Sequence, residues 1–144
     1  MVRKLIIAGN WKMSHRADKA REIVTGLRAE LADVTAVDIV VCPPFTSLAA
    51  AVEAAAGSNI VVAAQNLHWA ESGAFTGEIS AAMLTELPVT YVVIGHSERR
   101  QYFGETDETV NQRLRAALDA DLIPIVCVGE TQRDREAGET ESVV

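Results

Sequence analysis

Short apolar runs rich in β-branched residues recur along the chain and predict strands. Each run is nearly continuous in apolar character rather than alternating, which is typical of parallel strands covered on both faces. The predicted strands are Lys4 to Asn10, Val37 to Cys42, Ile60 to Gln65, Tyr91 to Gly95 and Leu122 to Val128.

The segments between these runs have the periodicity and the end signals of helices. The first segment places apolar residues on one face and charged residues largely opposite, the pattern of a surface helix packed on a sheet. The second begins after Pro43-Pro44 and stops at Gly57, which uses proline to start and glycine to end a helix. The apolar face of the first segment consists of Ala17, Ala20, Val24, Leu27 and Leu31.

Two later helices are predicted from their N-caps. Ser80 is placed to cap a short helix that ends at Glu86, and Thr106 is placed to cap a longer one that ends at Ala120. The longer helix has acidic residues in its first turn, which suit the positive end of the helix dipole. Its predicted buried stripe is Val110, Leu114, Ala117 and Leu118.

Repeated βα units of this kind predict an α/β fold built on a parallel sheet. The pattern by itself allows either a closed barrel or an open, doubly wound sheet. In both architectures ligands gather at the carboxyl ends of the strands, which is where Asn10, Lys12 and His96 fall. The sequence therefore indicates one edge of the sheet as the place to look for chemistry.

Composition excludes several classes of partner. The chain has 144 residues, of which 49% are hydrophobic and 23% charged, so residues 1–144 are expected to form one domain or part of one. A net charge of −7 argues against nucleic acid or an anionic membrane surface as a partner. No apolar stretch approaches the roughly 20 residues that span a bilayer, and the start has no secretory pattern, so a cytoplasmic protein is expected. Cys42 and Cys127 each follow an apolar run and are interpreted as small buried hydrophobes, not as a redox pair or metal ligands.

Asn10 and Lys12 form the first candidate site. If the strand continues through them, alternation points both side chains to the same side, away from Trp11 and Met13. Lys12 would then place a positive charge with three donors at a buried strand end, beside an amide that can orient it or bind a substrate oxygen. Spacing alone favours the alternative that Lys12 extends into solvent, as most lysines do.

His96 begins the second candidate site. It follows an apolar strand through Gly95, which leaves room for close approach of the backbone. A lone histidine is more often satisfied by neighbouring hydrogen bonds than reactive. The run Ser97-Glu98-Arg99-Arg100 that follows is interpreted as an ion-pair network that fixes geometry next to the site.

Five motifs in order resemble triosephosphate isomerases along the whole chain. This resemblance decides the fold in favour of a partial (β/α)₈ TIM barrel with five parallel βα units, whose carboxyl-terminal units are missing. The motifs are Gly9-Asn10-Trp11-Lys12-Met13, Cys42-Pro43-Pro44-Phe45, Gly73-Ala74-Phe75-Thr76-Gly77-Glu78, Ile94-Gly95-His96-Ser97-Glu98-Arg99-Arg100 and Cys127-Val128-Gly129-Glu130.

The resemblance implies a role for each matching residue. Asn10 and Lys12 would bind a phosphorylated triose, and Lys12 would counter the charge of the phosphate and of the developing enediolate. His96 would polarise the substrate carbonyl as a neutral imidazole, a role established for this enzyme family. Glu98 would be an accessory carboxylate. The family reaction interconverts D-glyceraldehyde 3-phosphate and dihydroxyacetone phosphate without a metal or organic cofactor.

The resemblance also implies contact between subunits. The loop from Asn66 to Glu78 matches the family's dimer loop, and its tip at Phe75 and Thr76 resembles the part that enters a partner subunit. A homo-oligomer is therefore one expected partner.

A barrel of this family has eight strands and about 250 residues, so the sequence predicts an incomplete one. The final segment agrees, since Thr131 to Val144 begins like a helix but reaches apolar residues only at its end. No residue matches the family's proton-abstracting glutamate, so weak or no isomerase activity is expected of the chain alone. The other reading is a catalytically silent split-barrel or assembly module.

Stability is expected to depend on a partner. Ile6, Ala8, Val92 and Ile94 are predicted to face the barrel interior and to lose contacts there. Self-association, a complementary barrel fragment or a longer product would replace those contacts.

Overall fold

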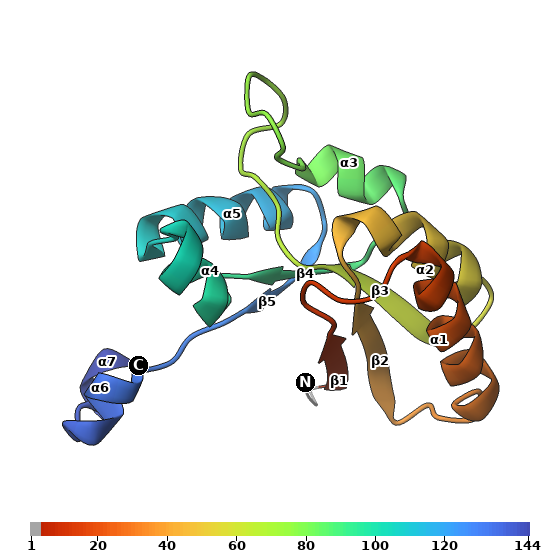
Figure 1. The fold of residues 1–144 in the computed structure, drawn as a ribbon, viewed down its shortest axis with the longest axis horizontal. Helices are drawn as coiled ribbons and strands as arrows, with labels where there is room; N and C mark the ends of the chain where they lie inside the picture. The colour runs from red at the N-terminus through yellow and green to blue at the C-terminus, as the bar shows by residue number, and fades with distance from the viewer. Residues whose placement is uncertain (1–3) are drawn as a thin grey trace.

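The computed structural model describes residues 4–144, and in it five parallel strands form one curled sheet in the order β1-β2-β3-β4-β5. Sequence order and spatial order coincide, so each strand lies beside the next one along the chain (Figure 1). The predicted strands are all present, shortened at their ends by up to two residues. They are β1 Leu5–Asn10, β2 Val37–Cys42, β3 Ile60–Ala64, β4 Tyr91–Ile94 and β5 Ile123–Val126.

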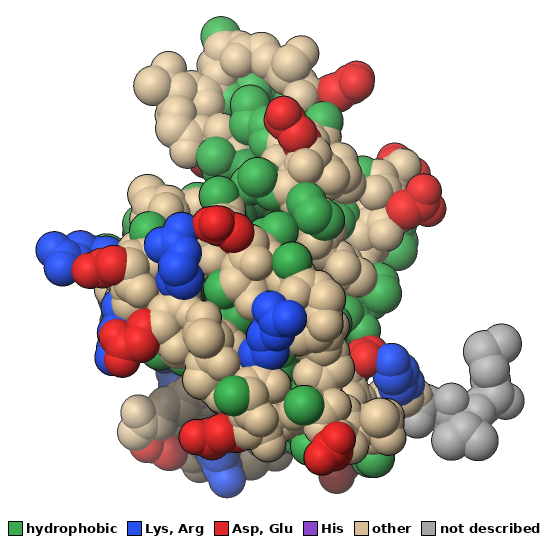
Figure 2. All heavy atoms as spheres, turned by 90° about the vertical axis from the view of Figure 1, so that its right-hand side faces the viewer, with side chains coloured by type: hydrophobic (Ala, Val, Ile, Leu, Met, Phe, Trp, Pro, Cys, Tyr) green, Lys and Arg blue, Asp and Glu red, His purple; other side chains and the backbone are tan. Residues whose placement is uncertain are grey.

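The connecting helices cover one face of this sheet. The helix α2 packs on β3, and α5 packs on both β4 and β5. Figure 2 looks onto the side where α1 lies in Figure 1 and shows side chains of both charges interspersed. Two ion pairs involve α1: Lys19–Glu22 within the helix and Arg21–Glu53 between α1 and α2. The helical elements are α1 Ala17–Glu30, the 3₁₀ turn η1 Phe45–Ser47, α2 Leu48–Ala55, α3 Ala81–Glu86, α4 Ser97–Phe103, α5 Asp107–Asp119, α6 Gln132–Glu136 and α7 Thr140–Val143.

The two predicted N-caps are present. The Ser80 hydroxyl accepts a hydrogen bond from the Met83 backbone N–H, and Thr106 forms a reciprocal capping box with Thr109. The buried stripe predicted for α5 is correct except at Leu118, whose side chain is 55% exposed.

The helix α4 is absent from the prediction, which placed only an ion-pair network at its residues. Its sequence, SERRQYF, has no apolar stripe, and none of its residues is buried. Two end signals were nevertheless present, because His96 caps its start and Gly104 ends it in the left-handed conformation at φ 68°.

The main core lies between the sheet and the helices. Its buried members include Ile39, Val62, Val92 and Ile94 from the strands, packed against helix residues such as Leu48. A smaller cluster on the opposite, inner face of the sheet consists of Val40, Cys42, Ala63, Tyr91 and Val93.

These two clusters correct the expected strand faces. Val92 and Ile94 face the helices and are fully buried, so the prediction that they face the barrel interior is wrong. Tyr91 and Val93 occupy the inner face instead. Because successive side chains on a strand point to opposite faces, an assignment of inward-facing positions that is wrong by one residue exchanges the two faces of the whole strand.

On β1 the predicted faces are correct. Ile6 and Ala8 are in register with Asp38 and Val40 of β2, and Val40 belongs to the inner cluster. Ile6 is 42% exposed, as expected for a side chain that has lost interior contacts.

A membrane span is not among the described helices: none is both long and apolar enough to cross a bilayer.

Candidate active site

The strand β1 ends at Asn10, and a left-handed turn then sets the position of Lys12. Lys12 has φ 53°, and the Asn10 side-chain oxygen accepts the Lys12 backbone N–H at 2.9 Å. Such a backbone conformation is unfavourable for a residue with a side chain and requires support of this kind. The expectation of strand alternation through Lys12 is therefore wrong, although Asn10 and Lys12 do line the same pocket.

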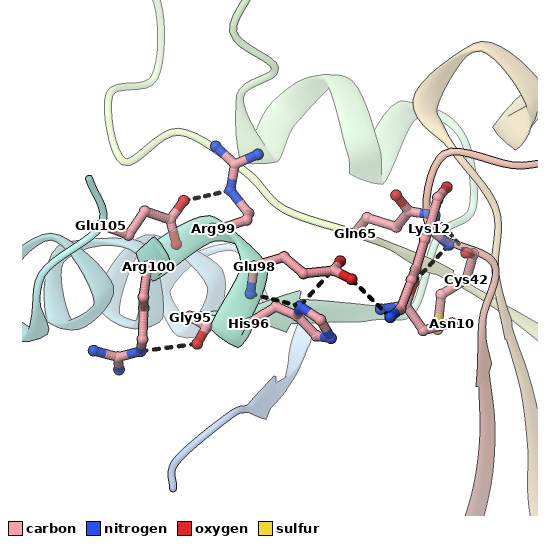
Figure 3. Close-up of polar contacts among 10 residues, drawn as sticks. All are labelled: Asn10, Lys12, Cys42, Gln65, Gly95, His96, Glu98, Arg99, Arg100 and Glu105. Carbon is pink, nitrogen blue, oxygen red and sulfur yellow. Dashed lines mark hydrogen bonds and ion pairs between the residues drawn. The ribbon is translucent and has the colours of Figure 1, made fainter. Parts of the chain in front are cut away.

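Gln65, which follows β3, supports this turn across β2. Its side-chain amide donates to the carbonyl oxygens of Lys12 and Cys42, both at 2.8 Å (Figure 3). One amide thus ties the ends of β1 and β2 together beside the pocket. Sequence reasoning treated Gln65 as the last residue of a strand and missed this role. A polar residue at the end of an apolar run was the available signal.

The pocket lies at the carboxyl ends of β1 to β4 and has a volume of about 260 Å³. It brings together Asn10 and Lys12 from the end of β1 and His96 and Glu98 from the end of β4. The full lining is Asn10, Lys12, Met13, Pro44, Phe45, Gln65, Asn66, His96, Glu98, Arg99 and Phe103.

Lys12 and Glu98 form an ion pair across this pocket. The Lys12 Nζ donates to Glu98 Oε1 at 2.7 Å, and this hydrogen bond lowers the pKa of the Glu98 carboxyl, with burial partly opposing it. The Lys12 side chain is 55% exposed, which agrees with the reading that spacing alone favours, namely a lysine that extends into solvent. Because exposed ion pairs contribute little, the ammonium group is available to an incoming anion.

His96 caps the start of α4. Its Nδ1 accepts the Glu98 backbone N–H at 3.2 Å, and its side chain is 22% exposed. The Glu98 carboxylate lies 3.5 Å from the same nitrogen, but its shorter contact is with Lys12. With Nδ1 engaged as an acceptor, Nε2 is the ring nitrogen that is left to donate to a ligand.

The arginines after Glu98 pair with other residues, which corrects the expected network. Arg99 bonds to Glu105, and Arg100 bonds to Asp107 and to the carbonyl oxygen of Gly95 (Figure 3 shows the Glu105 and Gly95 contacts).

A buried cluster behind α4 was missed by sequence reasoning. The Glu105 side chain is 2% exposed and lies between Arg99 and Arg113, while the Arg113 guanidinium carbon lies 4.8 Å from the centre of the Trp69 ring. The cluster joins α4 and α5 to the loop that contains Trp69. These residues lie in three separate segments, so no motif or spacing indicated their contact.

The loop from Asn66 to Glu78 leaves this pocket after Asn66, which is part of the lining. His68 is buried and stacks on Trp69, and Phe75 packs on its other side, with both pairs of ring centres 4.2 Å apart. Phe75 itself is 46% exposed, and Thr76 is exposed beside it. The structure thus separates Phe75 and Thr76 from the other candidate residues.

No metal centre accompanies the pocket: within residues 4–144, His, Cys, Asp and Glu side chains form no group of three or more that could hold a metal ion.

A curled parallel sheet with helices outside and polar residues gathered at the carboxyl strand ends defines a partial (β/α) barrel of the enzyme type. The family model described as triosephosphate isomerase matches residues 5–144. The chain belongs to the triosephosphate isomerase family.

Individual relatives agree with the family match. A triosephosphate isomerase of Moorella thermoacetica is 59% identical over 143 residues, which cover 99% of this chain and 57% of the relative. One from Gloeothece citriformis is 55% identical and is covered to 60% of its length. The crystal structure of the Bartonella henselae enzyme superposes on 98% of this chain and 58% of its own, with a TM-score of 0.91 and 36% identity. The chain therefore spans somewhat more than half the length of these relatives.

Proposed function

We propose that the pocket is the triose-binding part of a triosephosphate isomerase site. The observation that carries this proposal is the convergence of Lys12 and His96 on one small pocket, in a chain of this family. A cation and a neutral imidazole donor, from strand ends far apart in sequence, suit a small anion that contains a carbonyl group.

In this proposal Lys12 and Asn10 bind the phosphorylated triose. The substrate's negative charge competes with Glu98 for the Lys12 ammonium, and Lys12 also counters the enediolate charge as it develops. Asn10 holds the backbone turn that presents Lys12. Glu98 is accessory, because it sets the resting position of the ammonium.

His96 acts as the electrophile. Its Nε2–H donates a hydrogen bond to the substrate carbonyl oxygen. This hydrogen bond stabilises the negative charge that develops on the oxygen, and the ring carries no positive charge. The contact between Nδ1 and the Glu98 N–H holds the ring in the donor tautomer.

Binding without turnover is expected of the chain by itself. Glu98 is the single carboxylate in the described pocket lining, and it is engaged with Lys12. A base that removes the substrate proton typically contributes about 10² to 10⁴ in rate. The alternative, a catalytically silent module, predicts neither turnover nor specific binding of the triose phosphate.

The binding test uses Lys12→Met and titration of the chain with dihydroxyacetone phosphate by calorimetry or NMR. Loss of one charge-assisted hydrogen bond, about 1.5–3 kcal/mol, corresponds to roughly 10- to 150-fold weaker binding. Lys19→Met is the matched control, since Lys19 lies on α1 and pairs with Glu22. Equal affinity of all three proteins would overturn the proposal.

The turnover test measures hydrogen exchange between solvent water and dihydroxyacetone phosphate in the presence of the purified chain. We expect no exchange above that of the His96→Gln variant. Exchange close to that of a complete enzyme would show that another group here acts as the base.

We further propose that the tip at Phe75 and Thr76 makes a homodimer contact. The supporting observation is that this exposed tip is attached to a loop made rigid by the stacked rings of His68, Trp69 and Phe75. A rigid, partly apolar tip loses little conformational entropy on binding.

The contact is tested with Thr76→Arg, which adds a long charged side chain at the tip. Sedimentation is expected to show a smaller species than for the unchanged chain, while Thr25→Arg on the exposed side of α1 leaves the mass unchanged. An unaltered mass for Thr76→Arg would exclude the tip from the interface.

From the family we infer that the protein acts in the cytoplasm, in glycolysis and gluconeogenesis.

A further inference from the structure

The carbonyl oxygen of Gly95 lies where the pairing of β4 with β5 ends. The Cys127 backbone N–H donates to the carbonyl oxygen of Ile94 at 2.9 Å. The next carbonyl oxygen along the chain, that of Gly95, accepts the Arg100 Nε–H, also at 2.9 Å. Figure 3 shows the Arg100 side chain reaching back from α4 to this oxygen. A guanidinium group thus binds the backbone directly before His96.

The peptide units on both sides of the His96 Cα are held by hydrogen bonds from α4. The unit before it contains the Gly95 carbonyl group, which the Arg100 side chain binds. The unit after it contains the His96 carbonyl oxygen, which accepts the backbone N–H groups of Arg99 and Arg100 at 2.8 and 3.1 Å. Because each peptide unit is planar, holding both units sets the backbone dihedrals of His96, φ −55° and ψ 141°.

The bond to Gly95 is the part of this arrangement that depends on the side chain at position 100. Any residue there except proline supplies the backbone N–H. Gly95 has φ +70°, and glycine has the least restricted backbone, so the chain itself does little to orient the peptide unit after Gly95. None of the residues of α4 is buried, so packing does little to hold the start of this helix.

Arg100 is itself held from a second side. Its Nη1 donates to Asp107 Oδ1 at 2.6 Å, in the first turn of α5, and its side chain is 31% exposed. Arginine presents five donors in a rigid planar fork, so one guanidinium group binds Gly95 and Asp107 at once. The Asp107 side chain is 95% exposed, and ion pairs at such positions contribute little to stability.

We propose that Arg100 is a positioning residue, which aims the His96 ring into the pocket by holding the peptide unit between Gly95 and His96. The described lining of the pocket includes Arg99 but not Arg100, so Arg100 acts through His96 and not by touching the ligand. The ring is then fixed twice, because its Nδ1 also accepts the Glu98 backbone N–H. This inference rests on the proposed function, since it takes His96 as the donor to the substrate carbonyl oxygen.

The competing explanation is that Arg100 attracts an anionic ligand by its charge alone. A double-mutant cycle that joins Arg100→Met with His96→Gln separates the two explanations. Binding of dihydroxyacetone phosphate and of inorganic phosphate is measured by calorimetry or NMR titration, and folding by circular dichroism. The matched control is Arg115→Met, since Arg115 is an exposed arginine on α5 that bonds to Asn111.

We expect Arg100→Met to weaken binding of dihydroxyacetone phosphate by roughly 2- to 12-fold, the equivalent of one neutral hydrogen bond. In the His96→Gln background the same substitution should have no further effect, because the ring that Arg100 positions is gone. Inorganic phosphate has no carbonyl group for His96 to bind, so its affinity should change less. Arg115→Met should bind both ligands as the unchanged chain does.

A second measurement does not depend on ligand binding. The ring nitrogens of protein labelled with ¹⁵N-histidine are observed by NMR, and the His96 signals are assigned by their loss in His96→Gln. Arg100→Met is expected to shift or broaden the His96 signals and to leave those of His15 and His68 in place. Unchanged His96 signals in folded Arg100→Met would overturn the proposal.

The binding results distinguish failure of this inference from failure of the proposed function. If His96→Gln binds dihydroxyacetone phosphate as tightly as the unchanged chain, the donor role of His96 fails and this inference fails with it. If His96→Gln weakens binding but Arg100→Met has no effect, or has an equal effect in both backgrounds, only the positioning role of Arg100 fails. Equal weakening for both ligands contradicts that role too, because it indicates an effect of charge.

An unfolded Arg100→Met protein would be replaced by Arg100→Lys, which keeps the charge but lacks the fork. A single ammonium group favours the carboxylate of Asp107 over the neutral carbonyl oxygen of Gly95, so this variant should also weaken binding of dihydroxyacetone phosphate. Parent-like affinity and unchanged His96 signals in Arg100→Lys would overturn the proposal.

Discussion

At the scale of single residues, Lys12 shows how a correct position can follow from an incorrect reason. The sequence placed Asn10 and Lys12 on one side by strand alternation, but the strand stops at Asn10. Lys12 reaches the pocket because the backbone makes a left-handed turn there, which hydrogen bonds with Asn10 and Gln65 support. The sequence indicated four polar residues that share the pocket, Asn10, Lys12, His96 and Glu98, but not that Lys12 pairs with Glu98, 86 positions away.

Cys42 is a residue whose chemistry depends on burial. It is fully buried on the inner face of the sheet, and burial raises the pKa of its thiol to about 11, with Cys127 contributing. We therefore expect Cys42 in the folded protein to resist iodoacetamide at pH 8, while half-buried Cys127 reacts first.

Mass spectrometry of the alkylated peptides checks this order, and both thiols should react alike in guanidinium chloride. The raised pKa also predicts that the stabilisation from a neutral Cys42 is complete below the unfolded pKa, about 8.5, and is lost as the pH rises toward 11. Equal labelling of both cysteines in the folded state would contradict the burial of Cys42.

At the scale of elements, local signals predicted most of the helices and strands. Long helices with an apolar stripe and a capping residue were found because both features lie within a few residues of each other. The helix α4 has neither a stripe nor a hydroxyl or carboxylate cap, so it was missed. Its N-cap is His96 itself, which links the start of the helix to the candidate site.

Gly95 controls the junction between β4 and α4. It has φ +70°, and a Cβ there would lie 2.9 Å from Val110 Cγ2. Gly95→Ala is expected to destabilise the fold by about 1–3 kcal/mol through strain and overpacking, and to displace His96.

The matched control is Gly26→Ala in α1, where nothing lies within 4 Å of the added Cβ. This change should stabilise by about 0.5–1 kcal/mol, since alanine favours a helix interior. Urea unfolding of both variants measures the two effects. A Gly95→Ala protein as stable as the parent would show that β4 and α4 adjust freely.

At the scale of the whole molecule, stability is distributed unevenly across the sheet. The strands β2 to β4 have helices on one face and the inner cluster on the other, whereas β1 is exposed at every residue except Asn10 and β5 is exposed at its two ends. Regions with few buried apolar contacts open at lower free energy than the core.

Hydrogen exchange is expected to reflect this difference. In this chain, amides of β5 should exchange before those of β3, because in the described sheet β5 pairs on one side and β3 on both. Mass spectrometry of exchanged peptides makes the comparison. Protection of β5 equal to that of β3 would mean that the sheet opens only as a unit.

The sequence by itself determined the five strands, their parallel arrangement, most of the helices and the polar residues at the carboxyl strand ends, because periodicity, caps and motifs act over short stretches of chain. Tertiary structure decided the pairing of Lys12 with Glu98, the buried contact of Glu105 with Arg99 and Arg113, and the exposure of β1 and β5. It also decided which faces of β4 meet the helices, since a shift of one residue reverses a strand. Those features depend on which distant segments pack together, and that is fixed only when the sheet curls and the helices cover it.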